Sequence, residues 1–298
     1  MYATIQEEIE RSGGLSLAAL CASTGASRAG FYRFQQRDDS DPHMELRDRI
    51  QRIALDWPAY GYRRVTAELR RHGWEVNHKL VLRLMREDNL LCVRRRKFVH
   101  TTDSDHDRRV YPNLAESMTL SGVDQLWIAD ITYIRLLEAF VYLAVILDAY
   151  SRRILGWALE QTLEDELTLG ALRMALDQRR PAPGAIHHSD RGAQYASRDY
   201  VRLLKEHGFE ISMSRKASPW ENAACESFMK TLKHEEVCRQ EYRNLAEAQR
   251  SIQRFLEQVY NEKRLHSALG YRPPAEFEAS LLSAAGSLAE GSNASVSA

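Results

Sequence analysis

The stretch Leu126–Ile134, LWIADITYI, constrains the fold of this chain more than any other. It is apolar at both odd and even positions, as expected of a strand that is covered on both faces of a sheet. Asp130 interrupts it, and a buried carboxylate is strongly destabilising unless it is paired or binds a metal ion. The stretch alone leaves two explanations open for Asp130: a structural ion pair, for instance with Arg135 or Arg153, or a metal site.

The residues around this stretch predict an α/β domain. Three apolar segments separated by short turns predict an antiparallel meander, and two shorter strands then alternate with helices. The expected strands are Leu126–Ile134, Phe140–Leu147, Arg153–Leu159, Ala185–Ser189 and Phe209–Met213, and the expected helices are Asp165–Arg179, Ser197–His207, a helix from Ser218 to about Arg239, and Leu245–Asn261. The fold class is therefore α/β, with a mixed five-stranded sheet covered by helices on both faces.

Two further carboxylates have positions that suggest a shared site. Asp190 ends a short apolar strand, and Glu226 lies 36 positions later in a helix that follows the Ser218-Pro219 turn. Hard cations such as Mg²⁺ prefer carboxylate oxygens, and two such ions can hold the attacking and leaving oxygens of a phosphoryl displacement. We therefore predict that Asp130, Asp190 and Glu226 form one site for two divalent metal ions.

Other residues near these carboxylates have simpler interpretations. Glu226 and Lys230 could be an ordinary surface ion pair on a helix, which contributes little to stability. His187 and His188 could suggest a transition-metal site, but beside Asp190 we expect them to pack or to support the ligands. His188 and Asn222 are the expected supporting residues. No Ser/His/Asp triad or glycine-rich phosphate loop is present in the sequence, so ATP is not implied.

The charge distribution suggests a nucleic-acid partner. Net charge is zero over the whole chain, but residues 61–100 carry 11 Lys and Arg against 4 Asp and Glu, a net charge of +7. A solvated helical face would look the same. Residues 1–36 add a helix, a turn at Gly25 and a helix capped by Ser27; this is the helix-turn-helix pattern, with a generic helical hairpin as the alternative. The candidate DNA contacts are Arg28, Arg33, Arg63, Arg64, Lys79, Arg83, Arg94, Arg95, Arg96, Lys97, Lys230 and Lys233.

The length of 298 residues suits two or three domains. The expected divisions are a helix-turn-helix-like unit at 1–36, a second helical, basic, DNA-binding unit at 44–98, a connector at 99–124, a catalytic core at 125–240, a helical extension of the core at 241–282 and a disordered tail at 283–298. No apolar run is long enough to span a membrane, and the first residues lack a signal-peptide core. The four cysteines lack CxxC spacing, so neither a zinc site nor disulfides are indicated.

A long ordered set of motifs resembles a known family. The motifs are YGYRRVTAELRRHG, VLRLMREDNLL, WIADITYI, FVYLAVILDAYSRRILGWAL, HHSDRGAQYAS, SMSRKASPWENAACESFMKTLKHE and YNEKRLHSALGYRPPAEFE, within residues 45–278. They are similar to the B subunit, or second reading frame, of transposases of the insertion-sequence-three family. The catalytic core of that family looks like that of retroviral integrases, within the ribonuclease H-like fold. An ordered set of this length is far more specific than any single motif.

The resemblance implies that Asp130, Asp190 and Glu226 are the DDE triad of a polynucleotidyl transferase, and that Lys233 contacts DNA near the cleaved end. It implies Mg²⁺ or Mn²⁺, two ions per active site, and double-stranded DNA of the element ends and the target as partner. We also expect a frameshift fusion to the upstream-frame product, a homo-oligomer on DNA, and a bacterial cytoplasmic protein that joins the nucleoid when bound to DNA. Trp220-Glu221 replaces the Tyr-Asp common in relatives, a difference that concerns substrate contacts rather than metal binding.

The sequence therefore predicts a DNA transposase. A metal-activated water would cleave a strand at the end of an insertion sequence, and the released 3′-hydroxyl would attack another phosphodiester. Two other functions fit parts of the pattern: a ribonuclease H-like nuclease that only hydrolyses, and a non-catalytic DNA-binding regulator that uses the N-terminal helical units. Strand transfer on element-end DNA distinguishes the first alternative, and the intact triad argues against the second.

Overall fold

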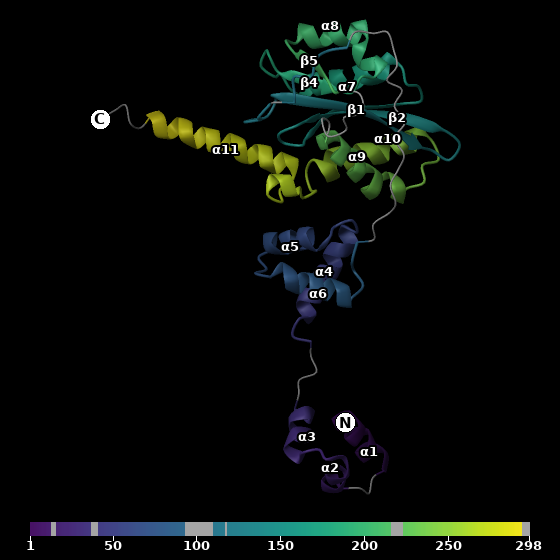
Figure 1. Cartoon of the computed structure of the whole chain (residues 1–298), viewed down its shortest axis with the longest axis vertical. Helices are drawn as coiled ribbons and strands as arrows, with labels where there is room; N and C mark the ends of the chain where they lie inside the picture. Colours follow the sequence, from purple (N-terminus) through teal and green to yellow (C-terminus); the bar gives the residue numbers. More distant parts are fainter. Residues whose placement is uncertain (13–15, 37–40, 93–109, 117, 216–222, 294–298) are drawn as a thin grey trace. The chain divides into compact units, whose positions relative to one another are not determined.

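The computed structural model describes residues 1–12, 16–36, 41–92, 110–116, 118–215 and 223–293, with side chains described as far as residue 283 (Figure 1). Two compact units are present, Met1–Arg52 and Ile53–Ala298. Helix α4 (Met44–Asp56) crosses the boundary between them. None of the helices in these ranges is long and apolar enough to cross a bilayer.

The first unit begins with three short helices, α1 (Tyr2–Ser12), α2 (Leu17–Thr24) and α3 (Arg28–Gln35). Ser16 and Ser27 cap α2 and α3, because each side-chain oxygen accepts a hydrogen bond from a backbone N–H of the first turn. Gly25 ends α2 with a φ of 69°, a conformation that glycine adopts without strain. The expected pair of helices around a turn at Gly25 is therefore present. Ile5, Cys21 and Phe31 form the small core of these helices.

A second helical pair opens the larger unit. Helix α5 (Tyr62–Arg71) and helix α6 (His78–Glu87) lie within the helical unit expected at 44–98. Each has a narrow apolar stripe that packs against the other helix, with Val65, Leu69, Val81 and Leu84 fully buried. Asn77 caps α6, because its side-chain oxygen accepts from the backbone N–H of Lys79 at 2.9 Å.

The core of this unit is a five-stranded mixed sheet in the order β3-β2-β1-β4-β5. The first three strands are antiparallel neighbours, and β4 and β5 are added in parallel to β1. The strands are β1 (Leu126–Arg135), β2 (Phe140–Asp148), β3 (Ile154–Glu160), β4 (Ile186–Ser189) and β5 (Glu210–Met213). The expected meander and the mixed sheet are both confirmed.

Helices cover both faces of the sheet (Figure 1). On one face, α7 (Asp165–Gln178) and α8 (Arg198–Glu206) pack on Trp127 and Ala129 of β1. On the other face, α9 (Ala223–Glu235) and α10 (Leu245–Arg254) pack on Leu126 and Ile128 of the same strand. Because successive side chains of a strand point to opposite faces, burial on both sides explains why Leu126–Ile134 is apolar throughout.

Several helix ends differ from the sequence expectation. Helix α9 ends at Glu235 and is followed by a 3₁₀ turn, Val237–Arg239. The expected helix Leu245–Asn261 becomes α10 and then a wider π turn, Phe255–Tyr260. Two short 3₁₀ segments, Ala193–Ala196 and Ser267–Leu269, complete the unit.

The tail expected to be disordered from residue 283 is helical as far as Asn293, since α11 spans Pro274–Asn293. This part of the sequence expectation is wrong. It gave most weight to the Gly and Ser content of the segment, whereas the many alanines and leucines favour a helix. Residues 294–298 lie outside the described part of the chain.

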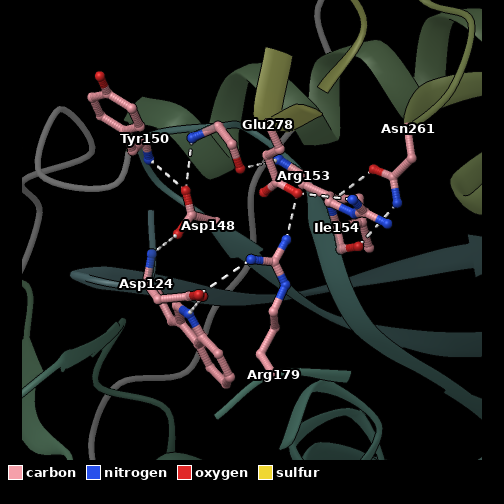
Figure 2. A network of polar contacts seen from close by, with 10 residues as sticks. Asp124, Asp148, Tyr150, Arg153, Ile154, Arg179, Asn261 and Glu278 are labelled. Carbon is pink, nitrogen blue, oxygen red and sulfur yellow. Dashed lines mark hydrogen bonds and ion pairs between the residues drawn. The ribbon is translucent and has the colours of Figure 1, made fainter. Parts of the chain in front are cut away.

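A polar network joins α11 to the sheet (Figure 2). Glu278 accepts hydrogen bonds from Arg153, at 2.8 Å, and from Arg179. Arg179 also donates to Asp124 at 3.1 Å. Asn261 exchanges two hydrogen bonds with the backbone of Ile154, at 2.9 and 3.0 Å. Arg153 is therefore the partner of Glu278, not of Asp130, which removes one of the two structural ion pairs considered for Asp130.

The network generates a stability prediction. Glu278→Gln keeps the shape of the side chain but removes the negative charge between two arginines, and should lower the free energy of unfolding by about 2 kcal/mol. Glu276→Gln is the matched control, because Glu276 pairs with Arg71 where both side chains are about 40% exposed, at 43% and 39%. Its effect should stay below about 1 kcal/mol. Urea unfolding of both variants measures the difference, and equal losses would contradict a special role for Glu278.

Candidate active site

The pairing of β1 with β4 brings two carboxylates to the same level of the sheet. The strands are parallel, and Ile128 is paired with His188. Continued by two residues, the same register places Asp130 level with Asp190, which follows the last residue of β4. Residues two apart in a strand share a face, so Asp130 lies on the face of Ile128, the one covered by α9.

Helix α9 supplies the third carboxylate. Its residues Cys225, Phe228 and Leu232 are buried in the core on this face, and they fix the rotation of the helix on the sheet. Glu226 lies in the first turn, with its side chain 23% exposed, and accepts a hydrogen bond from Lys230 at 3.0 Å. Phe228 and Leu232 thus anchor α9 on the sheet, and the ion pair of Glu226 and Lys230 considered from the sequence is present.

The pKa of Asp130 shows that the charges of the other two carboxylates reach it. Burial, followed by the negative charge of Asp190, raises the pKa of Asp130 to about 7. The backbone N–H of Ile131 and the charge of Lys233 oppose this rise, while Glu226 adds to it. Because like charges at close range disfavour ionisation, a divalent cation at this place would relieve the repulsion.

Lys233 lies beside these carboxylates. Its Nζ is 5.1 Å from the centroid of the Tyr133 ring, a cation–π geometry. Burial lowers the pKa of Lys233, and the charge of Asp130 partly restores it. Lys230, in contrast, is 75% exposed and is paired with Glu226. The two lysines therefore have different surroundings, although both lie on the same helix.

The donor set fits a hard divalent ion, because all three side chains offer carboxylate oxygens. Within the described ranges, however, no three His, Cys, Asp or Glu side chains lie close enough to form a ready-made metal site. The Glu226 carboxylate is instead paired with Lys230, at 3.0 Å. Metal binding would require Glu226 to exchange Lys230 for the ion.

The two histidines before Asp190 have structural partners. His188 shares a hydrogen bond with the hydroxyl of Ser212 at 2.8 Å, which connects β4 with β5. His187 shares one with the hydroxyl of Tyr200 at 2.9 Å, and burial lowers the pKa of His187 to about 3. Both histidines therefore pack the sheet next to Asp190. Asn222 and the Ser218–Glu221 turn lie outside the described residues.

The basic residues proposed for DNA contact fall into groups. Arg28, Arg33, Arg63, Lys79 and Arg83 are exposed on the helices α3, α5 and α6. Arg64 differs, because its Nε donates to the backbone oxygen of Leu265 at 3.1 Å. This bond attaches α5 to the C-terminal segment and explains Arg64 without DNA. The run Arg94, Arg95, Arg96 and Lys97 lies outside the described residues.

Sequence reasoning missed two neighbours of Asp190. Gly192 donates its backbone N–H to Asp190 Oδ1 at 2.9 Å, and a Cβ at Gly192 would lie 3.0 Å from the same oxygen. Tyr195 follows in the 3₁₀ turn Ala193–Ala196 and is buried. The signal available was the turn DRGAQY immediately after a strand, in which a glycine two residues after the carboxylate indicates a close approach of the backbone.

Comparisons with known proteins identify the family domains and relatives of this chain. Residues 121–219 and 207–274 each match the family description "Integrase core domain", and residues 43–98 match "HTH-like domain". The "Insertion element IS600 uncharacterized 31 kDa protein" of Shigella sonnei is 39% identical over 264 residues, covering 87% of this chain and 97% of that protein. "Transposase InsF for insertion sequence IS3A" of Escherichia coli K12 is 34% identical over 270 residues, covering 88% of this chain and 94% of that protein.

Solved structures with a similar core have low sequence identity. The catalytic core domain of HTLV-2 integrase in complex with magnesium, in its trimeric form, is 14% identical, with a TM-score of 0.42 over 52% of this chain and 96% of that one. The catalytic domain of Mos1 mariner transposase is 12% identical, with a TM-score of 0.39 over 45% of this chain and 71% of that one.

The class of the protein follows from the sheet and the matches: it has an integrase and transposase core and is an enzyme of the polynucleotidyl transferase class. Within that class, the chain belongs to the IS3 family of transposases. Its HTH-like domain and integrase core imply that it binds DNA. The family, the fold class and the transposase function predicted from the sequence are thus confirmed.

The two lysines of α9 generate one prediction. Lys233→Ala removes a half-buried cation beside Asp130 and should slow cleavage and joining by roughly tenfold, with a smaller change in affinity for element-end DNA. Lys230→Ala is the matched control on the same helix and should change both quantities less than about threefold. Single-turnover assays and DNA-binding isotherms measure the two effects. Equal losses of activity in both variants would refute the distinction.

The close approach at Gly192 generates another prediction. Its φ of −64° suits alanine, so Gly192→Ala should fold normally while the new Cβ displaces the Asp190 carboxylate. Strand transfer should fall by roughly tenfold or more. Gly122→Ala is the control, because its Cβ would meet nothing nearer than Gln125 at 4.0 Å. Activity assays and melting curves of the two variants test this, and unchanged activity of Gly192→Ala would show that the carboxylate has room to move.

Proposed function

We propose that Asp130, Asp190 and Glu226 are the catalytic carboxylates of this transposase. They would bind two Mg²⁺ or Mn²⁺ ions and cleave and join DNA strands at the ends of an insertion sequence. The observation that supports this most is the register of β1 and β4, which brings Asp130, in the middle of β1, level with Asp190, just after the end of β4, on the face covered by the helix of Glu226. Asp148, a structural carboxylate in the same domain, instead accepts several backbone N–H groups that close a turn.

In this proposal the bound ions supply Lewis acidity at the scissile phosphate and at the attacking oxygen. Asp130 and Asp190 hold the ions from the rigid sheet, and Glu226 completes the site from α9. Lys233 would contact a DNA phosphate next to the reacting group, where its positive charge opposes the charge that develops during transfer. His188 supports the strand that carries Asp190, through its hydrogen bond to Ser212.

DNA would be bound mainly through phosphates by the exposed basic residues of the helical units, namely Arg28, Arg33, Arg63, Lys79 and Arg83. Arg94, Arg95, Arg96 and Lys97 would add sequence-independent contacts. We further propose that the enzyme acts as a homo-oligomer, because two element ends have to be held together for transposition. A fusion to the upstream-frame product would supply further DNA recognition.

Charge removal at the carboxylates tests the proposal. Asp130→Asn, Asp190→Asn and Glu226→Gln should each reduce cleavage and strand transfer by about a thousandfold or more, while DNA binding persists. Asp199→Asn, an exposed carboxylate of α8, should retain activity. Cleavage and joining of labelled element-end DNA, together with fluorescence anisotropy for binding, give the readouts. Near-normal strand transfer by any one triad variant would remove that residue from the catalytic site.

The metal requirement is a separate prediction. Mg²⁺ or Mn²⁺ should support cleavage and joining, Ca²⁺ should support DNA binding without efficient chemistry, and excess chelator should abolish activity. The reason is an all-oxygen ligand set, which holds hard divalent ions. Full activity in chelator would overturn the metal assignment. Cleavage without joining in Mg²⁺ would favour a nuclease that only hydrolyses, and binding without either reaction would favour a DNA-binding regulator.

A further inference from the structure

Tyr195 carries a buried hydroxyl close to the carboxylate site. The residue is 2% exposed and lies in the 3₁₀ turn Ala193–Ala196, which starts three residues after Asp190. Its hydroxyl has no hydrogen-bond partner among the residues that the structure describes. Leaving a buried hydroxyl without a partner is destabilising, so a role for this group has to be considered.

The turn after β4 ties this ring to Asp190. The backbone N–H of Gly192 donates to Asp190 Oδ1 at 2.9 Å, and the backbone N–H of Tyr195 donates to the oxygen of Gly192 at 3.1 Å. A Cβ built on Gly192 would be 3.0 Å from Asp190 Oδ1 and 3.5 Å from Cδ2 of Tyr195. The carboxylate and the ring edge therefore lie within 3.5 Å of one common point.

Neighbouring aromatic rings hold the Tyr195 ring in place. Its centroid is 5.5 Å from that of Tyr200 in an edge-to-face arrangement, and 6.4 Å from that of His187. Unlike the hydroxyl of Tyr195, the hydroxyl of Tyr200 shares a hydrogen bond with His187, at 2.9 Å. Of these two packed tyrosines, Tyr195 is thus the one whose hydroxyl remains available.

The charges near the hydroxyl indicate what it would bind. Burial raises the pKa of Tyr195 well above its usual value, and the negative charge of Asp190 raises it further, ahead of Tyr200 and Asp130. The group therefore stays protonated and can donate. Carboxylates accept hydrogen bonds, and bonds to charged acceptors are stronger than those between neutral groups. Asp190 is the acceptor whose charge acts most strongly on this hydroxyl.

We propose that Tyr195 is a positioning residue of the active site: its hydroxyl donates a hydrogen bond through one water to the Asp190 carboxylate and orients that carboxylate for the metal. This rests on the proposed role of Asp190 as a metal ligand. Partners of this kind fix the direction of a ligand's lone pairs, and their removal commonly weakens metal binding by about 10–100-fold.

Tyr195→Phe tests the proposal because it removes the hydroxyl and keeps the ring. Titration of the full-length chain with Mn²⁺, by calorimetry without DNA, should show affinity weakened by about tenfold. Strand transfer should need correspondingly more Mg²⁺ and recover when Mg²⁺ is saturating. The melting temperature should not fall, because the lost hydroxyl has no partner among the described residues.

Tyr200→Phe is the matched control in the same aromatic cluster. It breaks the hydrogen bond to His187, so it should lower the melting temperature and leave Mn²⁺ affinity unchanged. Unchanged Mn²⁺ affinity in Tyr195→Phe, or the same weakening in Tyr200→Phe, would overturn the proposal.

Asp190→Asn separates this inference from the proposed site itself. If Asp190→Asn binds Mn²⁺ as the wild type does, Asp190 is not a ligand and both proposals fail. If Asp190→Asn loses binding while Tyr195→Phe retains it, only the role of Tyr195 fails. When both are correct, Tyr195→Phe should have no further effect in the Asp190→Asn background, because the two residues act through one carboxylate.

Discussion

The burial of the Asp130 carboxylate is the interaction on which the site depends. Asp130 lies on the middle strand of the sheet, where helices cover both faces and the neighbouring side chains are apolar. Burial and the charge of Asp190 raise its pKa to about 7. A sheet that needed only stability would carry an apolar residue here, since burying like charges together is unfavourable. In the proposed function, bound cations would relieve this repulsion.

Other buried carboxylates of the same unit are neutralised by the protein itself. Asp148 accepts backbone N–H groups from Asp124, Tyr150 and Ser151. Glu235 forms a bidentate ion pair with Arg264, with N–O distances of 2.7 and 2.8 Å. Each of these groups closes a turn or joins two segments.

Asp130 has a different environment. The contacts described for it are the backbone N–H of its neighbour Ile131 and the charge of Lys233. The contrast with Asp148 and Glu235 is what we expect if Asp130 serves to bind metal and the other two hold the fold.

The three carboxylates differ in how firmly the fold holds them. Asp130 and Asp190 are carried by hydrogen-bonded strands or follow them directly, so their separation is set by the sheet. Glu226 stands on a helix whose apolar face is fixed, but its own side chain is partly exposed and bound to Lys230. A surface ion pair of this kind is weak, so Glu226 can exchange it for a metal ion at little energetic cost.

Much of this arrangement was determined by the sequence alone. The two-sided apolar pattern of Leu126–Ile134, the turn residues and the caps at Ser27 and Asn77 specify local structure through short-range physics. These patterns were enough to predict the meander and the helices, and to single out Asp130 as a carboxylate in an apolar strand. The order of the motifs was enough to predict the family.

What only the tertiary structure decided depends on long-range contacts. The parallel register of β1 with β4 brings Asp130 level with Asp190, and no local pattern specifies it. Arg64 looks like a DNA contact in a basic stretch, but its bond to Leu265 assigns it to the interior of the unit. The hydroxyl of Tyr195 gains significance only when the turn after β4 folds back on Asp190. Sequence patterns report propensity and periodicity, whereas partners distant along the chain are chosen by packing and by the pairing of buried polar groups.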